Sequence, residues 1–293
     1  MNTGIARVFR SYADSWIALL GLFVLCVFAL GAIAAPWVAP QQPYDLSQLN
    51  LLDSRQPPDT PWTDRPGRTY LLGTDEQGRD MFSAIVYGLR ISLLVGLSST
   101  AIALAIGGVL GLIAGYKGGW AETLIMRAAD IQLSFPAILI ALVLLAVLGQ
   151  GTGKIVAALV AVQWAYYART TRSAAIVESR KEYMEAARLQ GLSHIRILLR
   201  HLLPNCLPPL IVVAALQVAA AISLEATLSF LGLGLPITEP SLGLLIANGF
   251  QHMLSGKYWM SFFPGVALLM LIVSINLVAD QLRDVLNPRL QKQ

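Results

Sequence analysis

Residues 182–205 read EYMEAARLQGLSHIRILLRHLLPN, a polar and basic stretch that lies between two long apolar segments. Glu185-Ala186-Ala187 is followed after three residues by Gly191, and nine further residues lead to His201-Leu202-Leu203-Pro204. A charged insert of this length does not help a chain to span a bilayer, because charged side chains are costly in hydrocarbon. We therefore expect the stretch to lie outside the membrane and to face a partner.

The composition around this stretch is that of a membrane protein. Hydrophobic residues make up 56% of the 293 residues, charged residues 13%, and the mean hydropathy is +0.62. A soluble domain carries about 25% charged residues, so we predict an all-α polytopic membrane protein. About 20 apolar residues cross a bilayer, and six predicted transmembrane helices meet that length, near 16–35, 90–115, 124–149, 154–172, 207–231 and 261–282.

The positions of the basic residues predict the topology. If both termini lie in the cytoplasm, the cytoplasmic segments hold 14 of the 21 lysines and arginines, among them Arg7, Arg10, Arg289 and Lys292. The first outer loop, about 36–83, is instead rich in aspartate. Cytoplasmic loops of membrane proteins carry the excess of Lys and Arg, so we predict that both termini are cytoplasmic.

The end of that outer loop contains a second distinctive run, LGTDEQGRDMFS at residues 72–83. Thr74 or Asp75 is well placed as the N-cap of a helix that enters the second span, with acids in its first turn. The acidic residues lack the alternation of an EF-hand loop, so capping is favoured over calcium binding.

Three features inside the predicted spans bear on packing and transport. Gly107, Gly111 and Gly115 recur every fourth residue, a pattern that serves close packing within the chain or at a dimer seam. In the third span, Pro136 predicts a kink and Arg127 is spaced to pair with Asp130. Glu225 is the one acid well inside a span, so it either lines a translocation path or braces an interhelical contact. Gln217, on the same predicted helix, is the second candidate for the path.

Both runs resemble the permease subunits of ATP-binding cassette (ABC) importers. The 182–205 stretch resembles their cytoplasmic EAA loop, with His201 where Ile is usual. The 72–83 run resembles the LGTDxxGRDxxS signature of C-type permeases in the dipeptide/oligopeptide/nickel family, carried here by Gly73, Thr74, Asp75, Gly78, Arg79 and Asp80. The resemblance implies a type I importer permease fold, with an N-terminal tail, first helix and periplasmic loop at 1–87, a permease domain at 88–283 and a cytoplasmic tail at 284–293.

The resemblance also implies roles for residues and partners. The coupling loop, 173–204, would dock on cytoplasmic ATPases through Glu185, Ala186, Ala187, Gly191, Leu203 and Pro204, with Glu185 reaching a partner arginine. The implied partners are a B-type permease, two ATPase subunits and a periplasmic or lipid-anchored solute-binding protein, in the bacterial inner membrane. A basic helix lying on anionic membrane lipid is the alternative for this segment.

No cofactor, metal, catalytic or nucleic-acid site is expected in the chain itself. Residues 148–155, LGQGTGKI, lack the first glycine and the Ser/Thr of a P-loop, so ATP and magnesium are expected on the partner ATPases. The chain is accordingly not expected to be an enzyme.

The resemblance favours di- and oligopeptides as the substrate, with nickel as the second choice and glutathione or opine-like compounds as others. Leu242 stands where many family members have Trp, which loosens assignment to a subfamily. An ion-coupled secondary transporter would need an intramembrane ion site and usually inverted repeats. The sequence offers one central acid and no convincing repeat, so this class is disfavoured.

Overall fold

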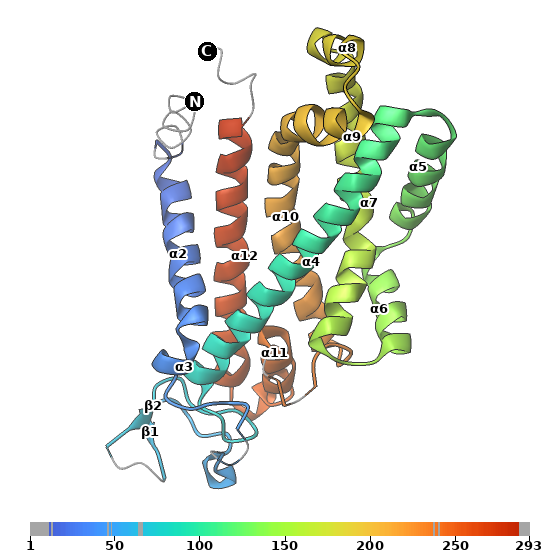
Figure 1. The fold of residues 1–293 in the computed structure, drawn as a ribbon. Coiled ribbons are helices and arrows are strands. Elements are labelled where there is room, and N and C mark those ends of the chain that lie inside the picture. The colour runs from blue at the N-terminus through green and yellow to red at the C-terminus, as the bar shows by residue number, and fades with distance from the viewer. Residues whose placement is uncertain are drawn as a thin grey trace.

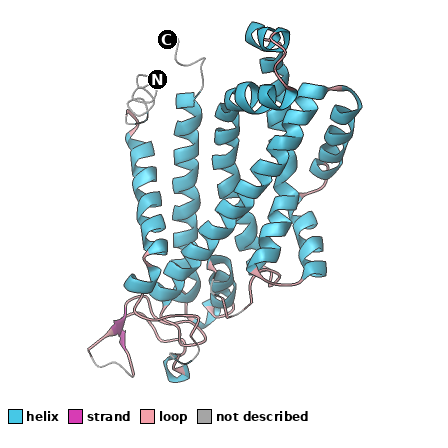
Figure 2. Cartoon of the chain, in the orientation of Figure 1, coloured by secondary structure: helices cyan, strands magenta, loops and turns pink. Residues whose placement is uncertain are grey.

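The computed structural model describes residues 12, 14–45, 47, 49–63, 67–236, 238–239 and 241–286. Within them the chain is a bundle of helices with a two-stranded sheet at one end (Figures 1 and 2). The helices are α2 (Trp16–Ile33), α3 (Ala35–Val38), α4 (Met81–Lys117), α5 (Gly119–Leu133), α6 (Ala137–Leu148), α7 (Thr152–Ser179), α8 (Glu182–Leu189), α9 (His194–Arg196), α10 (Leu203–Phe230), α11 (Leu242–Phe250) and α12 (Trp259–Leu286). Strand β1 (Thr60–Pro61) pairs antiparallel with β2 (Thr69–Tyr70), Thr60 opposite Tyr70.

The all-α membrane fold is confirmed, but the six predicted spans are not all straight, apolar helices. Four helical stretches in the described residues are long and apolar enough to cross a membrane: α2, α4, the continuous stretch His194–Phe230, and α12. The predicted fourth span falls in α7, which has 28 residues but carries polar groups such as Gln163 and Arg169. Helix α4 has 37 residues and begins nine residues before the predicted second span.

The predicted third span, 124–149, is a broken one. Helices α5 and α6 meet at an angle of 91°, so the pair counts as at most one span. The break falls at Ser134–Pro136, because proline has no N–H to donate and its ring clashes with the preceding turn. The predicted kink is thus confirmed. The predicted Arg127–Asp130 pair is wrong: Asp130 accepts from Arg169 of α7 at 2.5 Å.

The glycine stripe of α4 packs against α7 within the chain. An added methyl group at Gly107 would overlap the Trp164 carbonyl, and one at Gly111 would overlap the Ala168 carbonyl. At Gly115 it would come within 2.6 Å of the Ala175 side chain. Small residues allow two helices to approach this closely, so the stripe serves intrachain packing.

The two ends of the bundle differ in structure. At one end lie α8 and α9, together with the start of α2 and the end of α12 (Figure 1). At the other end lie α3, the sheet, α11 and the long loop 39–80 (Figure 1). Arg7, Arg10, Arg289 and Lys292, which support the predicted topology, fall outside the described residues.

Candidate functional site

Helices α8 and α9 form a hairpin, residues 182–202, whose first arm, α8, projects beyond the ends of the long helices (Figure 1). Its inner side is anchored: Met184 and Ala187 of α8 are buried in one cluster with Ile197 and Leu202. Burial of such side chains is the main source of stability for a helix of only eight residues. The hairpin is therefore a packed element of the fold and not a loose loop.

Gly191 makes the turn of this hairpin. Its φ is +70°, a left-handed conformation that glycine adopts without steric cost. The Gly191 N–H donates to the Arg188 carbonyl at 3.0 Å, and the Leu192 N–H donates to the Ala187 carbonyl at 3.3 Å. These two bonds form the Schellman motif that ends a helix. The predicted sharp turn at Gly191 is confirmed.

The outer side of the hairpin is exposed and partly apolar. Leu189 is 89% exposed and Ile195 is 70% exposed. Glu185 and Ala186 lie on the same exposed side, and Glu185 makes no ion pair with any residue that the structure describes. Of the two predicted small contact residues, only Ala186 is exposed, because Ala187 packs inward. An exposed carboxylate one helical turn from an exposed leucine, with a further exposed isoleucine on the other arm, offers a surface on which another protein can dock.

Tyr116, which belongs to no recognisable motif in the sequence, fixes the hairpin to the end of α4. Its hydroxyl is 2.8 Å from Nδ1 of His194, and the Arg188 guanidinium lies over its ring, 5.5 Å from the centroid. A cation over an aromatic ring adds about 0.5–1 kcal/mol at an exposed site. Tyr116 therefore contacts both arms of the hairpin.

The last six residues of the hairpin, 197–202, form a π-helical turn that continues into α10. Leu203 and Pro204 then begin α10, with Leu203 half-buried and Pro204 exposed. Pro204, Pro208 and Pro209 lack backbone N–H groups, so three donors of the intrahelical ladder are missing near this turn. Pro204 in the first turn of the helix fits the predicted start of the fifth span.

The 39–80 loop holds the second predicted set of residues, and it is held together by its own polar contacts. Arg79 Nε lies 2.5 Å from Asp75 Oδ2, and their side chains are 1% and 3% exposed. The other oxygen of Asp75 accepts from the backbone N–H groups of Gln77 and Arg79, both at 2.9 Å. Asp75 therefore serves the fold of this loop.

Asp80, and not Thr74 or Asp75, is the N-cap of α4. Its Oδ2 accepts from the Ser83 N–H at 2.8 Å and from the Ser83 hydroxyl at 2.6 Å. Burial raises the pKa of Asp80, and the bonds from Ser83 oppose that rise. The predicted cap is wrong because Thr74 is used elsewhere: its hydroxyl donates to the Asp53 carbonyl, and its carbonyl accepts from Trp259 Nε1 at 3.2 Å.

Gly73 and Gly78 both have positive φ, +77° and +76°. A side chain at Gly73 would press on the Trp259 ring at 2.8 Å, and one at Gly78 would overlap the Asn50 carbonyl. Each glycine is thus required by both its backbone conformation and its close neighbours. Together the six predicted residues fold the loop and dock it on the start of α12.

Glu225 is fully buried between α4 and α10. It accepts from the Ser92 hydroxyl of α4 at 3.2 Å and from the Ser229 hydroxyl at 2.8 Å. No surface of the residue reaches a cavity in this conformation. Its geometry is that of an interhelical brace, one of the two roles that its position in the sequence allows.

Gln217 faces another way, toward α6 and α7. It lines a pocket of about 510 Å³ whose polar residues are Gln163, Tyr166, Gln217, Ser223 and Thr227. Gln163 Nε2 donates to the Gln217 carbonyl at 3.1 Å, which ties α7 to α10 behind this pocket. Gln163 was missed from the sequence because it is a single polar residue in a largely apolar stretch, with no motif around it.

Comparison with known proteins places the chain in a family. Residues 107–292 match the model of the binding-protein-dependent transport system inner membrane component, and residues 5–58 match that of the N-terminal transmembrane domain of oligopeptide transport permease C. The di/tripeptide transport system permease protein DppC of Pseudomonas aeruginosa is 40% identical over 98% of this chain and 93% of its own. The dipeptide transport system permease protein DppC of Haemophilus influenzae is 37% identical over 94% of this chain and 91% of its own.

Among solved structures, inward-facing forms of the MetNI methionine ABC transporter align with a TM-score of 0.57 at 20% identity. The alignment covers 71% of this chain and 98% of the transporter chain. At that identity the likeness speaks for the fold, and it supports the type I importer architecture. The chain belongs to the family of binding-protein-dependent transport system inner membrane components.

Proposed function

We propose that this chain is the C-type permease subunit of an ABC importer that moves di- and oligopeptides across the bacterial inner membrane. The observation that carries this proposal is the projecting hairpin, which exposes Glu185, Leu189 and Ile195 on a rigid, anchored turn. The names of the relatives, which are peptide permeases, support peptides as the substrate. The ion-coupled transporter is not favoured by any feature of the described residues.

The hairpin is the proposed joint with the ATPases. Glu185 would accept a bidentate pair from a partner arginine, while Ala186 permits close approach and Leu189 and Ile195 supply apolar contact. Because Tyr116 contacts both arms of the hairpin, motion of the joint passes directly to α4. ATP and magnesium would bind to the two partner ATPase subunits, which do the hydrolysis.

The opposite end of the bundle is the proposed periplasmic side. The 39–80 loop and α11 would receive the solute-binding protein there, and both chain termini would be cytoplasmic. This orientation agrees with the position of the hairpin, which lies at the same end as the start of α2 and the end of α12 (Figure 1).

The polar pocket of α6, α7 and α10 is the proposed translocation face, completed by a B-type permease. Its two glutamines, two hydroxyls and Tyr166 offer donors and acceptors to a peptide backbone inside an otherwise apolar bundle. Glu225, being buried and bonded to Ser92 and Ser229, would brace this face from behind.

Reconstitution tests the proposal. The chain is purified with the subunits that copurify with it, placed in proteoliposomes with the binding protein, and supplied with ATP and a labelled dipeptide. ATP-dependent dipeptide uptake is expected, and excess nickel should not compete. ATP-dependent nickel uptake without dipeptide uptake would contradict the assignment of peptides as the substrate. Recovery of the chain without an ATPase would contradict its assignment to an ABC importer.

A further inference from the structure

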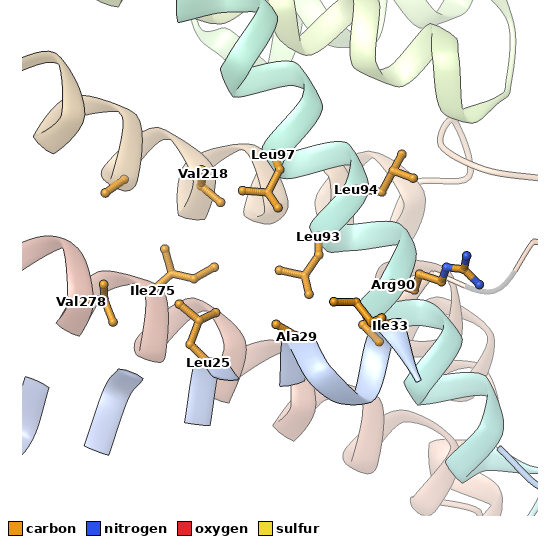
Figure 3. Close-up of a pocket in the computed structure, with 12 residues that line it drawn as sticks. Leu25, Ala29, Ile33, Arg90, Leu93, Leu94, Leu97, Val218, Ile275 and Val278 are labelled. Carbon is orange, nitrogen blue, oxygen red and sulfur yellow. The ribbon is translucent and has the colours of Figure 1, made fainter. Parts of the chain in front are cut away.

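An apolar groove of about 530 Å³ lies between four helices that are distant in the chain. Its walls include Leu25 of α2, Leu93 of α4, Val218 of α10 and Ile275 of α12 (Figure 3). Among the described residues that line it, Arg90 alone is charged. Arg90 is exposed and makes no ion pair with any residue that the structure describes, so its guanidinium is available to an anion from outside the chain.

Arg90 also lines a second cavity, of about 410 Å³, and this one is polar. Its other lining residues include Gln41, Gln42, Tyr44 and Tyr87. The rings of Tyr44 and Tyr87 meet edge to face, 5.2 Å apart. One arginine therefore stands where an apolar groove and a polar cavity meet.

The depth of Arg90 matches the border of the hydrocarbon. The next charged residue along α4 is Lys117, so the helix beyond Arg90 is uncharged for about 40 Å at 1.5 Å per residue. Tyrosines such as Tyr44 and Tyr87 concentrate at the membrane–water interface. The polar cavity thus lies at headgroup level, and the apolar groove extends below it.

We propose that this place is a binding site for an anionic phospholipid of the leaflet next to the 39–80 loop. The phosphate would accept from Arg90, one acyl chain would fill the groove, and the headgroup would occupy the polar cavity. The site lies apart from the hairpin and from the polar pocket of the proposed translocation face, so it goes beyond the proposed function.

The charge of the lining residues favours one headgroup. Arg90 is the one charged side chain among the described residues that line the polar cavity, so it would favour the net negative charge of phosphatidylglycerol over the zwitterionic phosphatidylethanolamine, and the glycerol could bond to the tyrosine hydroxyls. An arginine that merely reached the interface would contact any phosphate. Because the apolar groove and the polar cavity meet at Arg90, they could bind the acyl chain and the headgroup of one lipid together and retain it through purification.

Native mass spectrometry of the protein, purified in mild detergent with its copurifying subunits, tests the proposal. Phosphatidylglycerol should be retained in preference to phosphatidylethanolamine. Arg90→Gln should lower its retention about tenfold, the effect of losing one charge-assisted hydrogen bond. Ala29→Phe, which fills the groove and leaves the arginine intact, should lower it as well. Arg68→Gln, at an exposed arginine of the 39–80 loop, is the matched control and should change nothing.

Two results would overturn the site. If the wild-type protein retained both lipids equally, and Arg90→Gln retained as much lipid as the wild type, the contact would be unspecific. A cross-link from Leu94→Cys to the second permease, with no retained lipid, would assign the groove to a partner helix. Arg90→Lys keeps the charge and should retain part of the lipid, which separates loss of binding from loss of folding.

Discussion

The projecting hairpin and the 39–80 loop lie at opposite ends of the bundle, and they satisfy their polar residues in opposite ways. In the loop, Asp75, Arg79 and Asp80 are buried and bonded to neighbours in the same chain. In the hairpin, Glu185 is exposed and has no ion-pair partner among the described residues. Both segments were equally recognisable in the sequence.

This difference shows that a motif can be recognisable either because the fold requires its residues or because a partner contacts them. The loop motif encodes its own fold, since its two glycines and its buried charges, Asp75, Arg79 and Asp80, are each held by a neighbour within the chain. The hairpin motif encodes a contact surface, because only Gly191 and the buried residues are required by the fold. Changes in the loop should therefore act mainly on stability, and changes in the hairpin mainly on transport.

The largest effect on the free energy of unfolding is expected at the buried ion pair. Arg79→Leu leaves the Asp75 carboxylate buried without its charge partner and should cost about 3–5 kcal/mol. Denaturant unfolding in detergent, followed by tryptophan fluorescence, measures this. Arg55→Leu is the matched control, because Arg55 pairs with Glu76 on the exposed face of the same loop; it should cost at most about 1 kcal/mol. Equal costs would refute the internal role of the motif.

Glu225→Ala should have the next largest effect. It leaves the Ser92 and Ser229 hydroxyls without their acceptor and should lower the free energy of unfolding by about 1–3 kcal/mol. Gln217→Ala should leave stability nearly unchanged and lower dipeptide uptake, because Gln217 faces the polar pocket. A stable Glu225→Ala protein with lost uptake would assign Glu225 to the path instead.

A smaller, pH-dependent effect is expected at Asp80. Burial raises its pKa above the ordinary 3.8, so between the two pKa values the folded protein binds a proton more tightly than the unfolded chain. The stability contributed by this group is greatest below pH 3.8 and falls as pH rises through the folded-state pKa. Unfolding of the wild-type protein relative to Asp80→Asn, measured from pH 3.5 upward, should show this decline. A relative stability that rises with pH would contradict it.

The smallest effect on stability, and a large one on transport, is expected at Glu185. Glu185→Gln should change the free energy of unfolding by less than about 0.5 kcal/mol. It should lower uptake about tenfold, because one charge-assisted contact to the ATPase is lost. Glu182→Gln, at the other exposed acid of α8, is the control. Normal uptake by Glu185→Gln would remove the basis for the docking surface.

The sequence predicted the local features of this fold well. The turn at Gly191 and the break at Pro136 follow from the backbone preferences of single residues, and both are confirmed. The sequence was less informative about pairs of interacting residues that are distant from each other in the chain. Asp130 pairs with Arg169 on another helix and not with the nearby Arg127, because helix packing brings the two together.

The candidate sites divide in the same way. The hairpin residues were found because they form a spaced motif, whereas Tyr116 and Gln163 stand alone in the sequence and acquire their contacts only through packing. The cap of α4 was misplaced for a related reason. Thr74 suits a cap by residue type, but it is engaged by Asp53 and Trp259, which lie 21 and 185 residues away.

Helix α4 connects these two ends without interruption. Its 37 residues span about 55 Å at 1.5 Å per residue. Asp80 secures one end to the 39–80 loop, and Tyr116 secures the other end to the hairpin. Helix α4 is therefore one continuous element with the 39–80 loop attached at one end and the hairpin at the other. If the hairpin docks on an ATPase as proposed, a rigid-body tilt of α4 would carry its displacement to the 39–80 loop without a relay of side chains between them.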